Sequence, residues 1–200
     1  MFRRSLALIA AAAAALALAP VVEAARVSIR VEGRTQTIFA RAPRLVEAET
    51  PLQALDLASR AGEFYVHVQQ SSFGLFVDQI GLYPSAGSSG WVYKVNGASP
   101  PVGADQYALK EGDSVLWYWA DFDATTFAGP KTLLLVKSSP RCYRAFEQDD
   151  NGARTAARDV RIWIGSRARG TSSTGRFCLR AHTGLVHVRK AGAVRSNGLP

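Results

Sequence analysis

Residues 90–119 read GWVYKVNGASPPVGADQYALKEGDSVLWYW and contain three of the four tryptophans in this 200-residue chain. The two runs Trp91–Val95 and Asp113–Trp119 predict strands, in which successive side chains point to opposite faces of a sheet. The sequence NGASPPVGAD between them is rich in turn-forming residues, and Asn96-Gly97 predicts a tight turn. The stretch therefore predicts two strands of a sheet with aromatic faces.

The aromatic residues of this stretch are candidates for both core packing and ligand contact. A side chain of this size removes about 150–250 Å² from water when it is buried, so a small domain needs several of them simply to fold. We expect Trp117 in the core and leave both roles open for Trp91. The candidate ligand contacts are Trp91, Tyr93, Tyr118 and Trp119, because an exposed aromatic platform suits a flat ring or a sugar.

The segment before this stretch predicts a hairpin and one helix. Arg26–Val31 and Thr35–Phe39 alternate as strands around a turn. Thr50 followed by Pro51 and Gln53 forms a helix-start signal, and Gly62 ends a helix of about 11 residues. Further strands are expected at Phe64–Val68 and Leu75–Leu82. Two strands, a helix and more strands indicate an α+β fold, in which a mixed sheet carries one helix in a β-grasp arrangement.

Several short motifs resemble one known family. They are SGWVYKVNG at 89–97, PVGA at 101–104, Tyr107, and KEGDSVLW at 110–117. Together with the capped helix they resemble the transcobalamin carboxy-terminal-like β-grasp family over residues 26–120. The family takes its name from vitamin B12 carriers, so the resemblance makes cobalamin the first ligand to test, and we expect no other cofactor.

Charge divides the chain near residue 127. Residues 25–127 carry 8 Lys+Arg against 11 Asp+Glu, whereas residues 128–200 carry 14 against 4. We therefore predict a domain at 25–120, a linker at 121–131 and a basic module at 132–200. Closely spaced strand-like runs predict a small antiparallel β-sandwich for the module. The segments TSSTGRF at 171–177, GLVHV at 184–188 and VRS at 194–196 resemble the carboxypeptidase-regulatory, transthyretin-like sandwich.

The basic module predicts attachment to a polyanion. The candidate contacts are Arg176, Arg180, Arg189 and Lys190, because arginine pairs with phosphate or carboxylate through two parallel hydrogen bonds. The alternative is a solvated arginine-rich surface with no such partner. Since we expect export, an anionic polymer of the cell envelope is a better partner than nucleic acid.

The N-terminus and the cysteines indicate an extracytoplasmic protein. Residues 1–24 combine Arg3 and Arg4, an apolar run and a small-residue cleavage site, which is the pattern of a secretory signal peptide. No later segment is long and apolar enough to span a membrane. The two cysteines, Cys142 and Cys178, predict a disulfide in an exported chain, with two buried free thiols as the alternative.

No catalytic or metal-binding motif stands out. The three histidines, His67, His182 and His187, lack a linked nucleophile, and Cys178 with His182 supplies only half of a zinc site. The sequence therefore predicts an exported, non-enzymatic protein that binds a small molecule or a surface ligand. The alternative is a structural or adhesive envelope protein that attaches to anionic polymers through its basic module.

Overall fold

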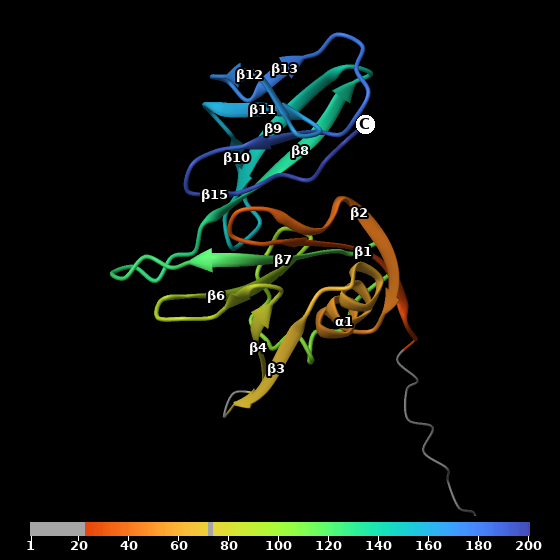
Figure 1. Cartoon of the computed structure of the whole chain (residues 1–200), viewed down its shortest axis with the longest axis vertical. Helices are drawn as coiled ribbons and strands as arrows, with labels where there is room; N and C mark the ends of the chain where they lie inside the picture. Colours follow the sequence, from red (N-terminus) through yellow and green to blue (C-terminus); the bar gives the residue numbers. More distant parts are fainter. Residues whose placement is uncertain (1–22, 72–73) are drawn as a thin grey trace, which may run out of the picture.

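The computed structural model describes residues 23–71 and 74–200, which form one helix and four sheets (Figure 1). Residues 1–22 of the predicted signal peptide lie outside this part of the chain. The one helix of the described part is not long and apolar enough to cross a membrane. The helix and its sheet lie at one end of the molecule, and the strands after residue 131 lie at the other.

The first sheet has the strand order β2-β1-β7-β6. It consists of β1 (Ala25–Glu32), β2 (Thr37–Ala48), β6 (Ser89–Val95) and β7 (Ser114–Asp121). Strand β1 runs antiparallel to β2 and parallel to β7, and β7 runs antiparallel to β6. The hairpin before β7 begins with Asn96 and Gly97 at φ values of 53° and 89°, as the tight-turn prediction requires.

Helix α1 (Pro51–Gly62) covers one face of this sheet. The Thr50 hydroxyl accepts a hydrogen bond from the Gln53 amide at 3.2 Å, so the predicted N-terminal cap is confirmed. Gly62 is the last helical residue, but the left-handed residue is Glu63, at φ 52°. Gly62 is required for packing instead, because a Cβ there would lie 2.6 Å from the Phe39 ring.

A small second sheet lies beside the edge strand β6. It consists of β3 (Val66–Ser71), β4 (Gly74–Ile80) and β5 (Tyr83–Pro84), in that order. Val77 and Ile80 of β4 join the core under α1. The sheet therefore closes one side of the first core and places the outer face of β4 near β6.

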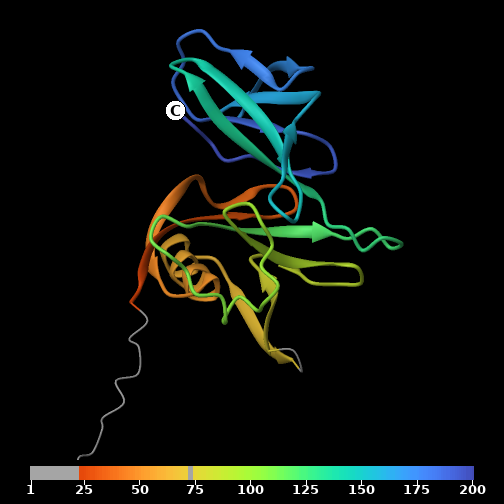
Figure 2. The same cartoon turned by 180° about the vertical axis from the view of Figure 1, so that it is seen from behind.

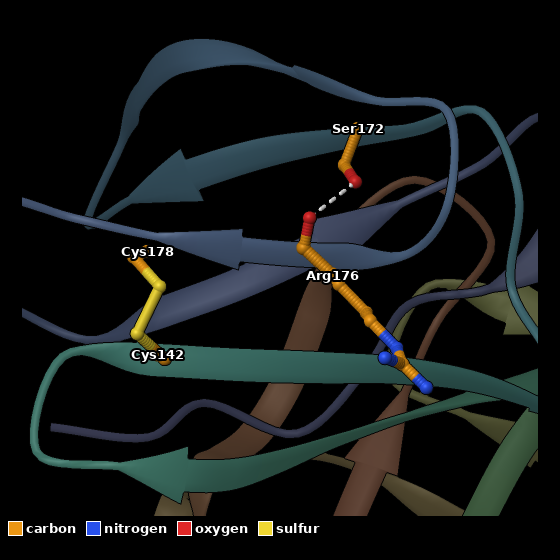
Figure 3. Close-up of a disulfide and its surroundings, with 4 residues drawn as sticks. All are labelled: Cys142, Ser172, Arg176 and Cys178. Atoms are coloured by element: carbon orange, nitrogen blue, oxygen red, sulfur yellow. Dashed lines mark hydrogen bonds between the residues drawn. A yellow bond between two sulfur atoms is a disulfide. The ribbon is translucent and has the colours of Figure 1, made fainter.

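The strands after residue 131 form two further sheets around a second hydrophobic core. The larger sheet consists of β8 (Lys131–Ser139), β9 (Cys142–Gln148), β10 (Arg154–Ala156), β13 (Arg176–Cys178) and β15 (Ala193–Val194). The smaller sheet consists of β11 (Val160–Ile164), β12 (Arg167–Ser172) and β14 (Val186–Arg189). Cys142 of β9 and Cys178 of β13 are directly opposite and form the predicted disulfide (Figure 3).

The predicted fold class, α+β with a β-grasp followed by an antiparallel β-sandwich, is wrong. The described residues contain one helix against fifteen strands, and the strands divide among four separate sheets. The larger late sheet is also mixed, because β15 pairs with β8 in parallel. Alternation identifies a strand but not the sheet that it joins, and the polar strands β10 and β12 show no alternation of apolar residues. The proposed domain boundaries at residues 120 and 131 stay a prediction.

A buried ionic cluster joins the first sheet to the last part of the chain. Glu32 has no exposed side chain and accepts hydrogen bonds from the Arg30 guanidinium at 2.7 Å and the Arg195 guanidinium at 2.8 Å. Arg30 also donates to the Arg195 carbonyl oxygen at 2.9 Å. The face of the first sheet opposite the helix is therefore covered by the strands that follow residue 131, as both views show (Figures 1 and 2).

Candidate ligand-binding site

A hollow of about 360 Å³ lies around the edge strand β6, and we call it the aromatic hollow. It is bounded by β4 on one side and by the segment after β7 on the other. The aromatic side chains that line it are Phe76, Trp91, Tyr93, Trp117, Tyr118 and Phe122. Its size and its mainly apolar walls are those of sites that hold small molecules.

The register between β6 and β7 fixes the floor of the aromatic hollow. Trp91 is directly opposite Trp119, and Tyr93 is directly opposite Trp117, so these four rings share the helix face of the sheet. Trp91, Tyr93 and Trp117 form the floor, whereas Trp119 lies outside the hollow. The Trp91 indole donates to the Tyr83 carbonyl oxygen at 2.8 Å. These pairs hold the aromatic side chains in fixed positions before any ligand arrives.

The rim of the aromatic hollow is more exposed than its floor. Leu75 and Phe76 of β4 are each 40% exposed. The Phe122 amide donates to the Ser88 carbonyl oxygen at 2.9 Å, which ties the segment after β7 to the loop before β6. A second hollow of about 660 Å³ adjoins the first and shares Phe76 and Phe122 with it. At its lip lies Phe127, which is 76% exposed.

Polar groups gather at one end of the aromatic hollow. The Lys94 ammonium is buried, lies 3.2 Å from an Asp150 carboxylate oxygen, and donates to the Asp149 carbonyl oxygen at 2.8 Å. Burial lowers the pKa of Lys94, and the two aspartates oppose that shift. Burial also raises the pKa of Tyr118, and the nearby Asp150 raises it further. The Tyr118 hydroxyl is therefore a neutral group at physiological pH.

Three of the four predicted ligand contacts line the aromatic hollow. Trp91 and Tyr118 do so from the interior, at 3% and 2% exposure. Tyr93 is half-buried and donates its hydroxyl to the Val102 carbonyl oxygen at 2.7 Å, and burial raises its pKa to about 12. Trp119 is turned toward a separate cavity of about 230 Å³, which it shares with Arg34.

Sequence reasoning missed the two residues that form the accessible wall, Phe76 and Phe122. A signal for an exposed apolar side chain in β4 was present, because Leu75, Phe76 and Val77 are consecutive apolar residues of one strand and cannot all point into the core. Phe122 was assigned to a linker. Its place beside β6 depends on pairing between segments that are distant in sequence, and local pattern does not reveal such pairing.

The four predicted polyanion contacts differ in their surroundings. Arg176 and Arg180 are exposed. The Arg189 guanidinium instead lies 4.3 Å from the centre of the Trp163 ring. The Lys190 ammonium lies 2.5 Å from a Glu147 carboxylate oxygen, which neutralises its charge locally.

The described residues offer little for metal chemistry. Within residues 23–71 and 74–200, no group of three or more His, Cys, Asp or Glu side chains is placed to hold an ion. His67 lies on β3, away from the aromatic hollow, with its Nδ1 atom 2.6 Å from an Asp78 carboxylate oxygen. The structure thus places no histidine or cysteine among the described residues that line the hollow.

Comparison with known proteins gives a match to a family model and distant likenesses to solved structures. Residues 50–121, which include α1, β6 and β7, match a domain of unknown function (DUF4430). No curated protein sequence matches the chain. A crystal structure of a candidate metal-binding protein from Ruminococcus gnavus ATCC 29149 is similar over 50% of this chain and 99% of its own, with 16% identity and a TM-score of 0.38. That likeness is too low to carry an argument about ligands, and the resemblance to transcobalamin-like domains stays a prediction.

Proposed function

We propose that this chain is an exported, non-enzymatic binding protein that holds a small ligand in the aromatic hollow. The observation that carries the proposal is the hollow itself, with rigid aromatic rings on its floor and the exposed Phe76 and Leu75 on its rim. Exposed phenyl and leucyl side chains beside a cavity have no role in the core of the protein. A bound ligand would remove their apolar surface from water, which is favourable.

The lining of the aromatic hollow defines the chemical class of the ligand. A volume of about 360 Å³ suits a molecule of one or two flat rings, which stack well on aromatic faces. The exposed Asp150 carboxylate and the Ser99 hydroxyl lie at the polar end. The ligand we propose is therefore a flat apolar molecule that carries a hydrogen-bond donor at one end.

Two observations support the absence of catalysis and the export. The side chains that line the aromatic hollow include no histidine, cysteine or lysine in the described part of the chain, and its tyrosines are neutral at physiological pH. The hollow does contain Asp150 and Ser99, but no histidine of the described residues lies beside them to take up a proton from the serine, so we expect ligand binding rather than catalysis there. The Cys142–Cys178 disulfide is typical of proteins in oxidising compartments.

Fluorescence titration with N-phenyl-1-naphthylamine, a neutral flat aromatic probe with one N–H donor, tests the proposal. We expect saturable binding at one site, and we expect Phe76→Ala to weaken it about tenfold, because one stacked ring is lost. Leu82→Ala is the matched control, since Leu82 is also exposed but does not line the hollow. Equal affinity in the wild type and Phe76→Ala, with both proteins folded, would contradict the proposal.

Cobalamin is tested separately by equilibrium dialysis of the purified, oxidised protein. Saturable binding that competes with the aromatic probe would identify a corrinoid as the ligand and support the resemblance to vitamin B12 carriers. Absence of cobalamin binding, with probe binding intact, would exclude this ligand and leave a smaller ring system as the natural one.

A further inference from the structure

We propose that the outer face of β9 and its partner strands is a docking surface for a linear polymer that bears phosphate groups. The surface is defined by Arg144, Arg154 and Arg176, which we call the arginine ladder. It is separate from the aromatic hollow, so a negative result for one proposal does not affect the other.

The pairing of β9 with β13 places two arginines side by side. Arg176 is directly opposite Arg144, Phe177 is opposite Tyr143, and the disulfide-bonded cysteines are opposite each other. The rings of Phe177 and Tyr143 stack at 5.5 Å in the second core. Because side chains alternate along a strand, Arg144 and Arg176 point to the opposite, outer face.

A third arginine lies further along the same face. Arg154 of β10 is directly opposite Gln148 of β9, and Gln148 shares the face of Arg144 because the two positions are four residues apart. The Gln148 side chain is buried beside Gly97, whereas that of Arg154 is exposed. Between them, Phe146 has its ring centre 5.2 Å from the Arg144 guanidinium. All three ladder arginines are exposed.

The ladder arginines have no acidic partners. In the described part of the chain, none of these three guanidinium groups forms an ion pair with a carboxylate. Like charges directly opposite each other destabilise a sheet. An arrangement that keeps Arg144 and Arg176 adjacent and unpaired is therefore suited to an external anion that bridges them.

The arrangement favours phosphate over other anions. A guanidinium presents a planar set of donors that matches the oxygens of a phosphate group. Neighbouring strands are about 5 Å apart, so two guanidinium groups can bind the same phosphate or two successive phosphates. The disulfide lies two positions away on both strands and holds the register of the pair (Figure 3). Arg154 extends the contact along the sheet, which suits a chain of phosphates more than a single ion.

Inorganic polyphosphate is the probe for this proposal. We expect the full, oxidised protein to bind it with an affinity that falls steeply as salt rises. Replacing both Arg144→Gln and Arg176→Gln should weaken binding about tenfold or more, because charge-assisted hydrogen bonds are lost. The control is Arg167→Gln with Arg169→Gln, which removes the same charge from exposed positions on β12. We expect only a slight loss there.

Three results would overturn the proposal. They are absence of polyphosphate binding at low salt, an equal loss of affinity in the two double variants, and equally tight binding of polyglutamate. The last would indicate that any anionic polymer suffices. Thermal unfolding of both variants provides the folding control, and we expect no loss of stability from Arg144→Gln and Arg176→Gln, since they remove a like-charge contact.

Discussion

Acid should destabilise this protein through one buried histidine, His187 of β14. Its side chain has no exposed surface, its ring stacks on Trp163 with centres 6.1 Å apart, and its Nδ1 atom has no hydrogen-bond partner in the structure. Burial lowers its pKa to about 4, and the positive charges of Arg41, Arg189 and Arg195 contribute to the shift. The folded state therefore resists protonation of this ring.

The size and sign of the effect follow from the two pKa values of His187. The unfolded chain takes up the proton near 6.5 and the folded chain only near 4, so the unfolded state binds more protons between these values and stability falls with falling pH. The contribution is fully present above about pH 6.5. Between about pH 7.5 and pH 5 the free energy of unfolding should fall by about 2 kcal/mol, which lowers the midpoint of thermal unfolding by about 4–8 °C.

Urea denaturation followed by tryptophan fluorescence at the two pH values measures this loss. In His187→Gln the loss should be smaller by about 2 kcal/mol, whatever the stability of the variant itself. Every other titratable group is present in both proteins, so the difference between them reports on His187 alone. The same pH dependence in the wild type and the variant would refute the reasoning.

Two further substitutions probe the contacts that hold the late strands in place. Glu32→Gln should lower the free energy of unfolding, measured by urea denaturation, by about 3–5 kcal/mol, because it leaves the buried Arg30 and Arg195 without a counter-charge. Glu32→Asp should retain part of the stability. Equal stability of Glu32→Gln and the wild type would contradict the role of the cluster. Removing the disulfide with Cys142→Ser and Cys178→Ser should cost about 4 kcal/mol, as expected for a closed loop of 36 positions. A loss of stability below about 1 kcal/mol would show that removal of the disulfide adds little conformational freedom to the unfolded chain.

The local features of this fold could be predicted from the sequence. Thr50 and Gln53 predicted the start of the only helix in the described residues, and two strand-like runs on either side of a turn-rich segment predicted β6 and β7. These signals come from neighbours within a few residues. The cysteine pair was predictable for a different reason, since the chain has only two.

The assembly of the strands could not be predicted in the same way. Strand β12 has the sequence RARGTS, which has no apolar alternation and resembles a turn, yet its backbone pairs with β11. The accessible wall of the aromatic hollow depends on β4 and Phe122 meeting β6. Each of these contacts is decided by the pairing of distant backbone segments, and a period of two residues carries no information about the partner.

The buried cluster of Glu32, Arg30 and Arg195 also constrains the order in which the chain can fold during synthesis. Glu32 belongs to the first strand, and its partner Arg195 is 163 positions later. Until that residue has emerged, Arg30 alone compensates the carboxylate, and one face of the first sheet lacks its cover. Contacts between such distant positions raise contact order and slow folding. The stability of the first sheet therefore depends on a residue that is 163 positions later in the chain.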